Sequence, residues 1–207
     1  PQAGRYRQLT QFGIEAIGSK SPSLDAEAIN LQSNLYESLG LTNLRLSINS
    51  IGTGDARGRF IEAFRGYLRG YSEELSTESQ SRLVTNPLRI LDSKSEIDRA
   101  IVADGPKILD YLDDDETKHF SLVLRDLDSL GIQYEIDSSI VRGLDYYTHT
   151  VWEFEPEIGG GQSTIGGGGR YDGLLEQLGG DPTPGVGFAT GIERIILNMG
   201  EQGLLSE

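Results

Sequence analysis

The segment from Gln133 to Glu155, QYEIDSSIVRGLDYYTHTVWEFE, decides the fold, because strand signals return in it after a long helical stretch. Strand patterns also precede that stretch: residues alternate with period two from Arg5 to Ile17, and a second strand is expected over Leu44–Asn49. Two strand-rich regions around a helical middle predict an α+β fold, with an antiparallel sheet flanked by helices and interrupted by an all-helical insertion.

The helical middle sets the predicted domain boundaries. Helical spacing starts after Asp55, a plausible N-cap, and ends at Gly131. We therefore expect an insertion domain at 55–131 and a core made of 1–54 and 132–207. Within the core we expect a helix over 23–39, a strand over 185–189 and a following helix. The expected apolar stripe of the first helix comprises Leu24, Ala28, Leu31, Leu35 and Leu39, and Ile192, Ile195, Ile196 and Met199 are expected to face inward on the last.

Composition excludes several classes of protein. The 207 residues contain no cysteine, which excludes disulfides, thiol catalysis and cysteine-ligated metals. No apolar run approaches the roughly 20 residues that span a bilayer, so we expect no membrane contact and a cytoplasmic location. The net charge of -14 argues against a general basic surface for nucleic acid. Four arginines between Asp55 and Gly70 are typical of a solvated helix face, and they also allow a local contact with nucleic acid: Arg57, Arg59, Arg65 and Arg69.

The run Val141–Thr150 combines a cation, a carboxylate and two adjacent phenols. Arg142 offers a fork of donors suited to a carboxylate or a phosphate, which favours an anion-binding surface. An edge strand in which Arg142 pairs with Asp145 is the alternative. No metal site is predicted, because His119 reads as an ordinary core or surface histidine and the acidic run 113–116 as the start of a helix.

Three further segments carry candidate residues. Alternation places Arg5, Arg7, Gln11 and Glu15 on one strand face, with Gly13 leaving space for a ligand. The glycines of 164–173 permit either close backbone approach to a ligand or a mobile surface loop, and the following Arg170-Tyr171-Asp172 favours a site. Arg194, in the first turn of the last helix, could reach over the preceding strand to a planar ring or a phosphate, or lie on the helix surface.

Taken together, these segments resemble the histidyl-tRNA synthetase family of class II aminoacyl-tRNA synthetases. GRYRQLTQFGIEAIG resembles the second half of class II motif 2, and PGVGFATGIER resembles motif 3. VRGLDYYTHTVWEFE and GGRYDGLLEQLGG resemble the two histidine-specific motifs of the family. The resemblance covers nearly the whole chain and implies a class II synthetase-like sheet.

The resemblance implies a histidine pocket. Gln11 would hold the substrate α-amino group, and Glu15 would face the imidazole. Tyr147 would lie across the ring, and Tyr146 and Tyr171 would complete the pocket.

It also implies a site for ATP with Mg²⁺ on the phosphates. Arg142 would be the catalytic arginine that contacts the ATP α-phosphate and the histidine carboxylate. Arg194 would bind ATP, and Arg5 or Arg7 would reach its phosphates. The implied reaction forms histidyl-adenylate and transfers histidine to tRNA(His), with the insertion near the acceptor stem and a homodimer in the full-length protein.

The chain departs from the family at both ends. It starts inside motif 2 and stops after motif 3, so we expect an N-terminally truncated catalytic fragment with recognisable pocket geometry and little or no aminoacylation. Two alternatives stay open: the histidine-binding regulatory paralogue of ATP phosphoribosyltransferase, and a module that only binds histidine or a nucleotide.

Overall fold

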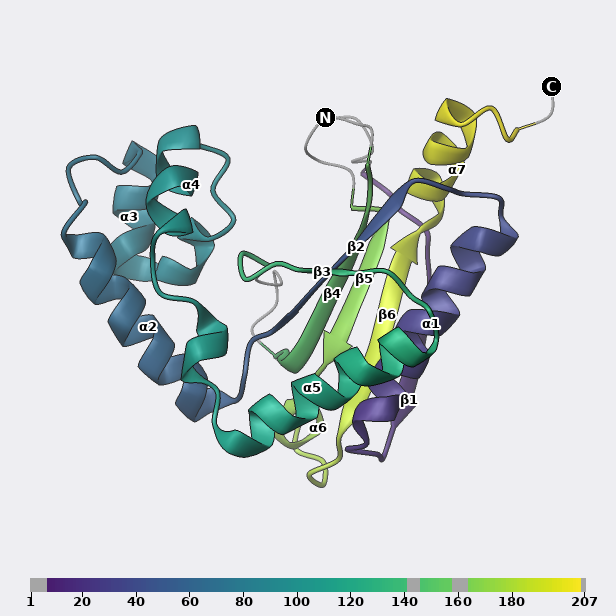
Figure 1. Cartoon of the computed structure of the whole chain (residues 1–207), viewed down its shortest axis with the longest axis horizontal. Coiled ribbons are helices and arrows are strands. Elements are labelled where there is room, and N and C mark those ends of the chain that lie inside the picture. The colour runs from purple at the N-terminus through teal and green to yellow at the C-terminus, as the bar shows by residue number, and fades with distance from the viewer. Residues whose placement is uncertain (1–6, 141–145, 158–163, 206–207) are drawn as a thin grey trace.

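The computed structural model describes residues 7–140, 146–157 and 164–205 as a six-stranded sheet with helices packed on it (Figure 1). The strands are β1 Gln11–Ile17, β2 Leu44–Ser50, β3 Glu135–Ile136, β4 Thr148–Pro156, β5 Gly166–Arg170 and β6 Gly185–Gly191. The helices are α1 Pro22–Ser38, α2 Gly54–Arg69, α3 Thr77–Thr85, α4 Glu96–Ala103, α5 Asp114–Ser129, α6 Leu174–Gln177 and α7 Ile192–Glu201, with 3-10 turns at Pro87–Ile90 and Ile108–Tyr111. In the described part, no helix is long and apolar enough to span a membrane.

The sheet is mixed, with strand order β1-β6-β5-β4-β2-β3. Neighbouring strands are antiparallel except β2 and β3, which pair in parallel through Ser47 with Glu135 and Ile48 with Ile136. The prediction of an antiparallel sheet is therefore wrong at β3. The chain leaves β2 and returns only after the helical middle, a crossover long enough to permit parallel pairing.

The glycine-rich segment forms the central strand β5, with all five residues buried. A Cβ atom at Gly166 would lie 2.5 Å from the Tyr36 hydroxyl, and one at Gly168 would lie 2.6 Å from the Trp152 ring. The alternative of a mobile surface loop is therefore excluded for residues 166–170. These two glycines are required because large side chains occupy the space beside the strand.

Helix α1 buries a face that differs from the predicted apolar stripe. Leu31 of the predicted stripe is 49% exposed, and the buried residues are Asp25, Ala26, Ala28, Ile29, Gln32 and Tyr36. Gln32 lies inside because its side chain accepts a hydrogen bond from the Trp152 indole at 2.7 Å and donates one to the Tyr36 hydroxyl at 2.9 Å. Hydrogen-bonded polar groups of this kind are tolerated in a core.

Three other elements differ from prediction in detail. Strand β1 begins at Gln11, and residues 7–10 are exposed and lie outside any strand. The N-cap of α2 is Thr53 instead of Asp55. Ile196 of α7 is 48% exposed, whereas Ile195 is buried as predicted. The acidic run does begin a helix, because Asp113 caps α5 in a reciprocal capping box with Glu116.

The hydrophobic residues form two main cores. One lies between the sheet and α1, α5 and α7, and it includes Phe120, Val123 and Leu127 of α5. The other joins α2, α3 and α4 through a cluster that runs from Phe60 to Ile108. Figure 1 shows α1 and α5 across one face of the sheet and α2, α3 and α4 to the left of it. The domain division at residues 54 and 131 stays a prediction, and α5 packs with the sheet.

Candidate active site

The sheet face opposite α1 carries the predicted residues of β1 above a floor of small residues. Strand register places Glu15 beside Gly187 of β6 and Gly169 of β5. The next row contains Gly13, Ala189 and Gly167. Directly paired residues share a face of the sheet, so these rows form a floor on which a substrate can approach the backbone.

Glu15 lies at one end of this floor. Its carboxylate accepts a hydrogen bond from the Tyr171 hydroxyl. Gly187 makes room for the carboxylate, since a Cβ there would lie 2.0 Å from Glu15 Oε2. Gly185 does the same for the phenol, since a Cβ there would lie 2.4 Å from the Tyr171 ring. Burial and then the Glu15 carboxylate raise the pKa of Tyr171, so the phenol stays protonated as a donor.

The three predicted tyrosines form one aromatic cluster beside Glu15. The rings of Tyr146 and Tyr147 have centroids 4.5 Å apart, and Tyr146 meets Tyr171 edge-on at 5.9 Å. Tyr147 packs over Gly169, where a Cβ would lie 2.7 Å from its ring. The cluster is backed by apolar side chains that include Ile51 and Val151. The structure thus brings together Glu15 and all three tyrosines from three separate segments.

Gln11 and Arg194 lie at the other end of the floor. Gln11 pairs with Gly191, and the aliphatic stem of Arg194 runs over Gly191 with its Cγ and Cδ atoms 3.6 Å from a Cβ built there. The Arg194 guanidinium donates to the carbonyl of Thr164. Gln11 lies four positions before Glu15 on the strand, which corresponds to a distance of about 13 Å. The two predicted histidine ligands on β1 therefore lie at opposite ends of the floor.

The remaining predicted arginines are not part of this arrangement in the described residues. Arg7 lies exposed just before β1. Arg5 and Arg142 fall outside the described residues, so their roles stay predictions.

Glu153 is a candidate residue that the sequence did not single out. Register places it on β4 beside Gly167, in the same row as Gly13. The Thr164 hydroxyl lies 3.0 Å from Glu153 Oε2 and 3.2 Å from Glu155 Oε1. The alternation of Val151, Glu153 and Glu155 could have indicated that both carboxylates share one face of this strand, but only the strand register shows that it is the face of Gln11 and Glu15.

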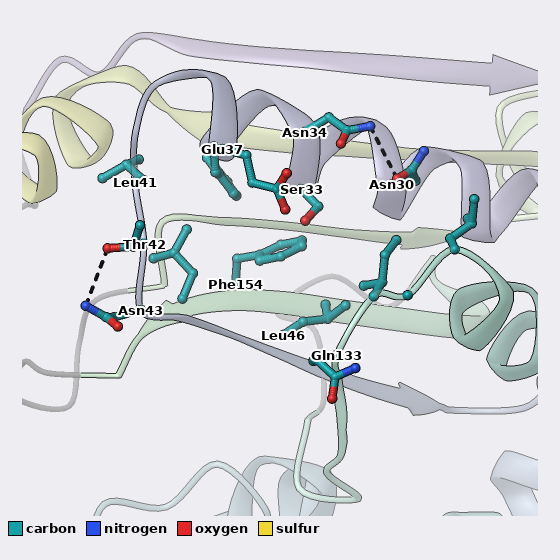
Figure 2. Close-up of a pocket in the computed structure, with 15 residues that line it drawn as sticks. Asn30, Ser33, Asn34, Glu37, Leu41, Thr42, Asn43, Leu46, Gln133 and Phe154 are labelled. Carbon is teal, nitrogen blue, oxygen red and sulfur yellow. Dashed lines mark hydrogen bonds between the residues drawn. The ribbon is translucent and has the colours of Figure 1, made fainter.

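A separate pocket of about 410 Å³ opens on the other side of the sheet, beside α1 (Figure 2). Its floor includes Leu46 and Phe154, and its rim includes Asn30, Glu37 and Gln133. None of the predicted site residues lines it.

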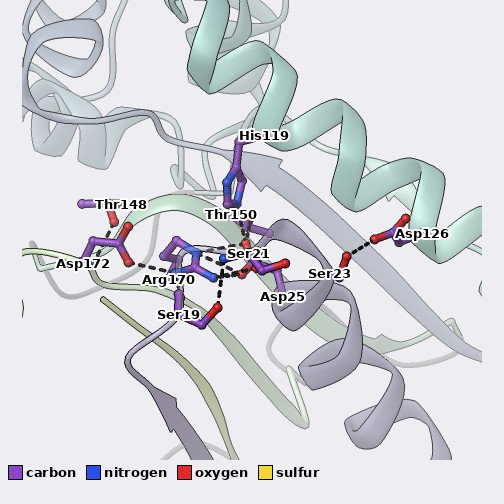
Figure 3. Close-up of polar contacts among 10 residues, drawn as sticks. All are labelled: Ser19, Ser21, Ser23, Asp25, His119, Asp126, Thr148, Thr150, Arg170 and Asp172. Atoms are coloured by element: carbon purple, nitrogen blue, oxygen red, sulfur yellow. Dashed lines mark hydrogen bonds and ion pairs between the residues drawn. The ribbon is translucent and has the colours of Figure 1, made fainter. Parts of the chain in front are cut away.

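The arginine of the predicted Arg170-Tyr171-Asp172 element is buried, and Figure 3 shows it beside Asp25 of α1. Arg170 forms an ion pair with Asp25 of α1, and both side chains are fully buried. Asp25 also bonds His119, at 2.8 Å, which agrees with an ordinary structural histidine. Of this element, only Tyr171 reaches the aromatic cluster, and the network around Arg170 was not predicted.

Comparison with known proteins decides the family. The family model described as histidyl-tRNA synthetase matches residues 68–195. The chain belongs to the histidyl-tRNA synthetase family. It is 55% identical over 203 residues to the histidine–tRNA ligase of Protochlamydia amoebophila, covering 98% of this chain and 48% of that protein. It is 50% identical to the histidine–tRNA ligase of Bacillus subtilis, and the match covers 95% of this chain and 47% of that protein.

Solved structures of the family agree with the fold. The apo histidyl-tRNA synthetase of S. aureus superposes with a TM-score of 0.75 at 41% identity, over 98% of this chain and 50% of that one. A Bacillus halodurans protein described as ATP phosphoribosyltransferase regulatory subunit/histidyl-tRNA synthetase has a TM-score of 0.61 at 22% identity, covers 92% of this chain and 53% of that one, and shares the fold alone. The chain spans about half the length of the curated relatives it matches.

Proposed function

We propose that this chain is the part of a histidine–tRNA ligase that binds L-histidine and ATP and forms histidyl-adenylate. The observation that carries the proposal is the contact between Glu15 and Tyr171 at the end of a floor of small residues, beside Tyr146 and Tyr147. A neutral imidazole has one donor and one acceptor nitrogen. Glu15 can accept from the N–H, and a phenol of the cluster can donate to the other nitrogen.

The rest of the substrate fits the length of the floor. With the imidazole at Glu15, the histidine backbone would lie over Gly13 and Ala189, a pair of small residues. Gln11 and Arg194 at the far end would meet the amino group and the nucleotide. The separation of Glu15 from Gln11 along β1 thus fits a substrate that extends from the imidazole toward the nucleotide.

In the proposed reaction, the histidine carboxylate attacks the α-phosphorus of ATP in line, and pyrophosphate leaves. A carboxylate is already a nucleophile, so no general base is needed. The protein accelerates the step by placing two anions together and offsetting their charge. Arg142 is the residue expected to do this by resemblance. In a second step, the terminal adenosine hydroxyl of tRNA(His) attacks the acyl carbon and AMP leaves.

Mg²⁺ would reach the site with the ATP phosphates. This ion takes oxygen ligands and is often held by one or two carboxylates plus substrate phosphates. Glu153 and Glu155, which converge on Thr164, are the residues that fit. The ion would supply charge neutralisation on the polyphosphate. The same proposal includes three further points. The α2 arginines would contact the tRNA acceptor stem, the full-length protein would form a homodimer, and its location would be cytoplasmic.

Calorimetry with L-histidine and ATP, separately and together, tests the proposal. We expect histidine to bind and Glu15→Gln to weaken that binding roughly tenfold or more, as loss of a hydrogen bond to a charged group predicts. Glu27→Gln, an exposed position on α1, is the matched control and should change nothing. Absence of histidine binding, or equal affinity of the Glu15→Gln variant, would contradict the proposal for this chain. Histidine binding without any ATP binding would instead favour the regulatory alternative.

A further inference from the structure

Arg170 has all five of its N–H donors directed at acceptors inside the protein. Its Nε–H and one Nη2–H point to Asp25, and the other Nη2–H points to the carbonyl of Ser21 at 3.3 Å. Its Nη1 group donates to the carbonyl of Ser19 at 2.9 Å and to Asp172 at 3.0 Å. A fully used, fully buried guanidinium has no donor left for a substrate.

The contacts of Arg170 continue into both segments that carry the tyrosines. Asp172 follows Tyr171, and its backbone N–H donates to the Thr148 hydroxyl at 3.2 Å. Thr148 follows Tyr147 and pairs with Arg170 in the β4–β5 ladder. The ladder is irregular immediately after this pair, between Thr148 and Val151. Side-chain bonds therefore fix the two segments to each other where regular strand pairing stops.

Asp25 connects the two tyrosine-bearing segments to helices α1 and α5. Besides Arg170, its carboxylate accepts from the Thr150 hydroxyl at 2.7 Å and contacts His119 of α5 at 2.8 Å (Figure 3). Helices α1 and α5 and strands β4 and β5 thus meet at one buried carboxylate. A buried ion pair is weak evidence for stability, and in some proteins such a pair specifies one arrangement of the elements that it joins.

We propose that Arg170 is a positioning residue that sets the separation of Tyr147 and Tyr171, and hence the width of the histidine pocket, through Asp172 and Thr148. The inference rests on the proposed function. The two rings pack directly on the backbone of the sheet, since a Cβ at Gly169 would overlap Tyr147 and a Cβ at Gly185 would overlap Tyr171. The position of each ring therefore follows the backbone that carries it.

Substitutions at Thr148 and Arg170 test the inference. Thr148→Val removes the acceptor for the Asp172 N–H at nearly constant volume, and Thr148→Ser keeps it. Arg170→Lys keeps the charge and loses the fork of donors. We expect Thr148→Val to weaken histidine binding about fivefold, Thr148→Ser to restore it, and Arg170→Lys to weaken it by about tenfold or more. ATP affinity, measured alongside by calorimetry, should be unchanged.

NMR of ring-labelled tyrosine separates this inference from the proposed function. Arg170→Lys and Thr148→Val should shift the ring resonances of Tyr147 and Tyr171, whereas Arg125→Lys, in an exposed pair with Asp126, should not. If the unsubstituted chain binds no histidine, the proposed function fails, and the ring resonances still test the positioning role. Unchanged resonances, or equal loss of ATP and histidine affinity, overturn the inference. If Arg170→Lys does not fold, the ring resonances and the histidine affinity of Thr148→Val alone test the inference.

Discussion

The Glu15 carboxylate reaches the Tyr171 hydroxyl across strand β6, because Gly187 between them has no side chain. The contact joins β1, an edge strand of the described sheet, to the segment that follows β5. Three residues that are far apart in sequence therefore define one end of the candidate site. Their dependence on each other can be tested at the glycine.

Gly187→Ala should weaken histidine binding strongly, and it should lower the free energy of unfolding only moderately. A Cβ would lie 2.0 Å from Glu15 Oε2 and 2.3 Å from the carbonyl oxygen of Ile14, so the carboxylate must move. We expect a loss of about 1–3 kcal/mol in the free energy of unfolding and a fall of roughly tenfold or more in histidine affinity. Urea unfolding and calorimetry measure the two effects. Gly58→Ala, in a helix with no atom within 4 Å of its Cβ, should be neutral or stabilising and serves as the control.

The raised pKa of Tyr171 predicts a loss of stability at alkaline pH. Burial and Glu15 keep the phenol protonated in the folded state, whereas an unfolded tyrosine ionises near pH 10. Its contribution is complete below about pH 10 and is lost as the pH rises toward the folded pKa. Tyr171→Phe should lower the thermal midpoint at neutral pH and reduce its decline between about pH 9.5 and 11. An identical decline in both proteins would show that Tyr171 does not ionise on unfolding in this range.

Local patterns predicted the parts of the site that depend on local structure. Period two placed Gln11, Gly13 and Glu15 on one face, and acidic residues before an apolar stripe predicted the start of α5 at Asp113. The pattern failed where partners are distant in sequence. Asp25 is buried because Arg170, 145 residues away, pairs with it. A run of glycines carries no periodicity, so β5 could not be told from a loop.

Asp98 should make the helical middle sensitive to acid. Its fully buried carboxylate accepts hydrogen bonds from the hydroxyls of Ser76, Ser79 and Ser93, each at 2.6 Å. Burial alone would raise the pKa of Asp98, but these bonds outweigh it and lower the pKa to about 2. The folded pKa is depressed, so the contribution is present above about pH 4 and is lost as the pH falls toward 2.

Asp98→Asn should therefore lower the free energy of unfolding by on the order of 2 kcal/mol at neutral pH. The variant should also lose less stability than the unsubstituted chain as the pH falls below about 4. Urea unfolding followed by circular dichroism at pH 7, 4 and 3 would measure both changes. Asp92→Asn, at an exposed aspartate nearby, is the matched control. A cost at pH 7 that persists unchanged at pH 3 would assign the effect to packing instead of charge.

His149 should make the stability of the segment between Tyr147 and Thr150 depend on pH near 6. Its backbone has a φ of 48°, its ring stacks on His119 at 5.0 Å, and its Nδ1 is buried without a hydrogen-bond partner in the described structure. Burial and then the neighbouring His119 lower its pKa, against the opposing pull of Asp172 and Glu116. An unfolded imidazole gains its proton near pH 6.5, whereas the folded one resists protonation.

The contribution of His149 is thus complete above about pH 6.5 and is lost as the pH falls below that value. His149→Asn removes the titrating group and tolerates the positive φ better than most residues. We expect the thermal midpoint of the unsubstituted chain to fall more between pH 7 and 5 than that of the variant. Since His149 lies two residues after Tyr147, histidine affinity should show the same difference in pH dependence. Parallel midpoint curves would show that His149 gains its proton equally well in the folded and unfolded chains.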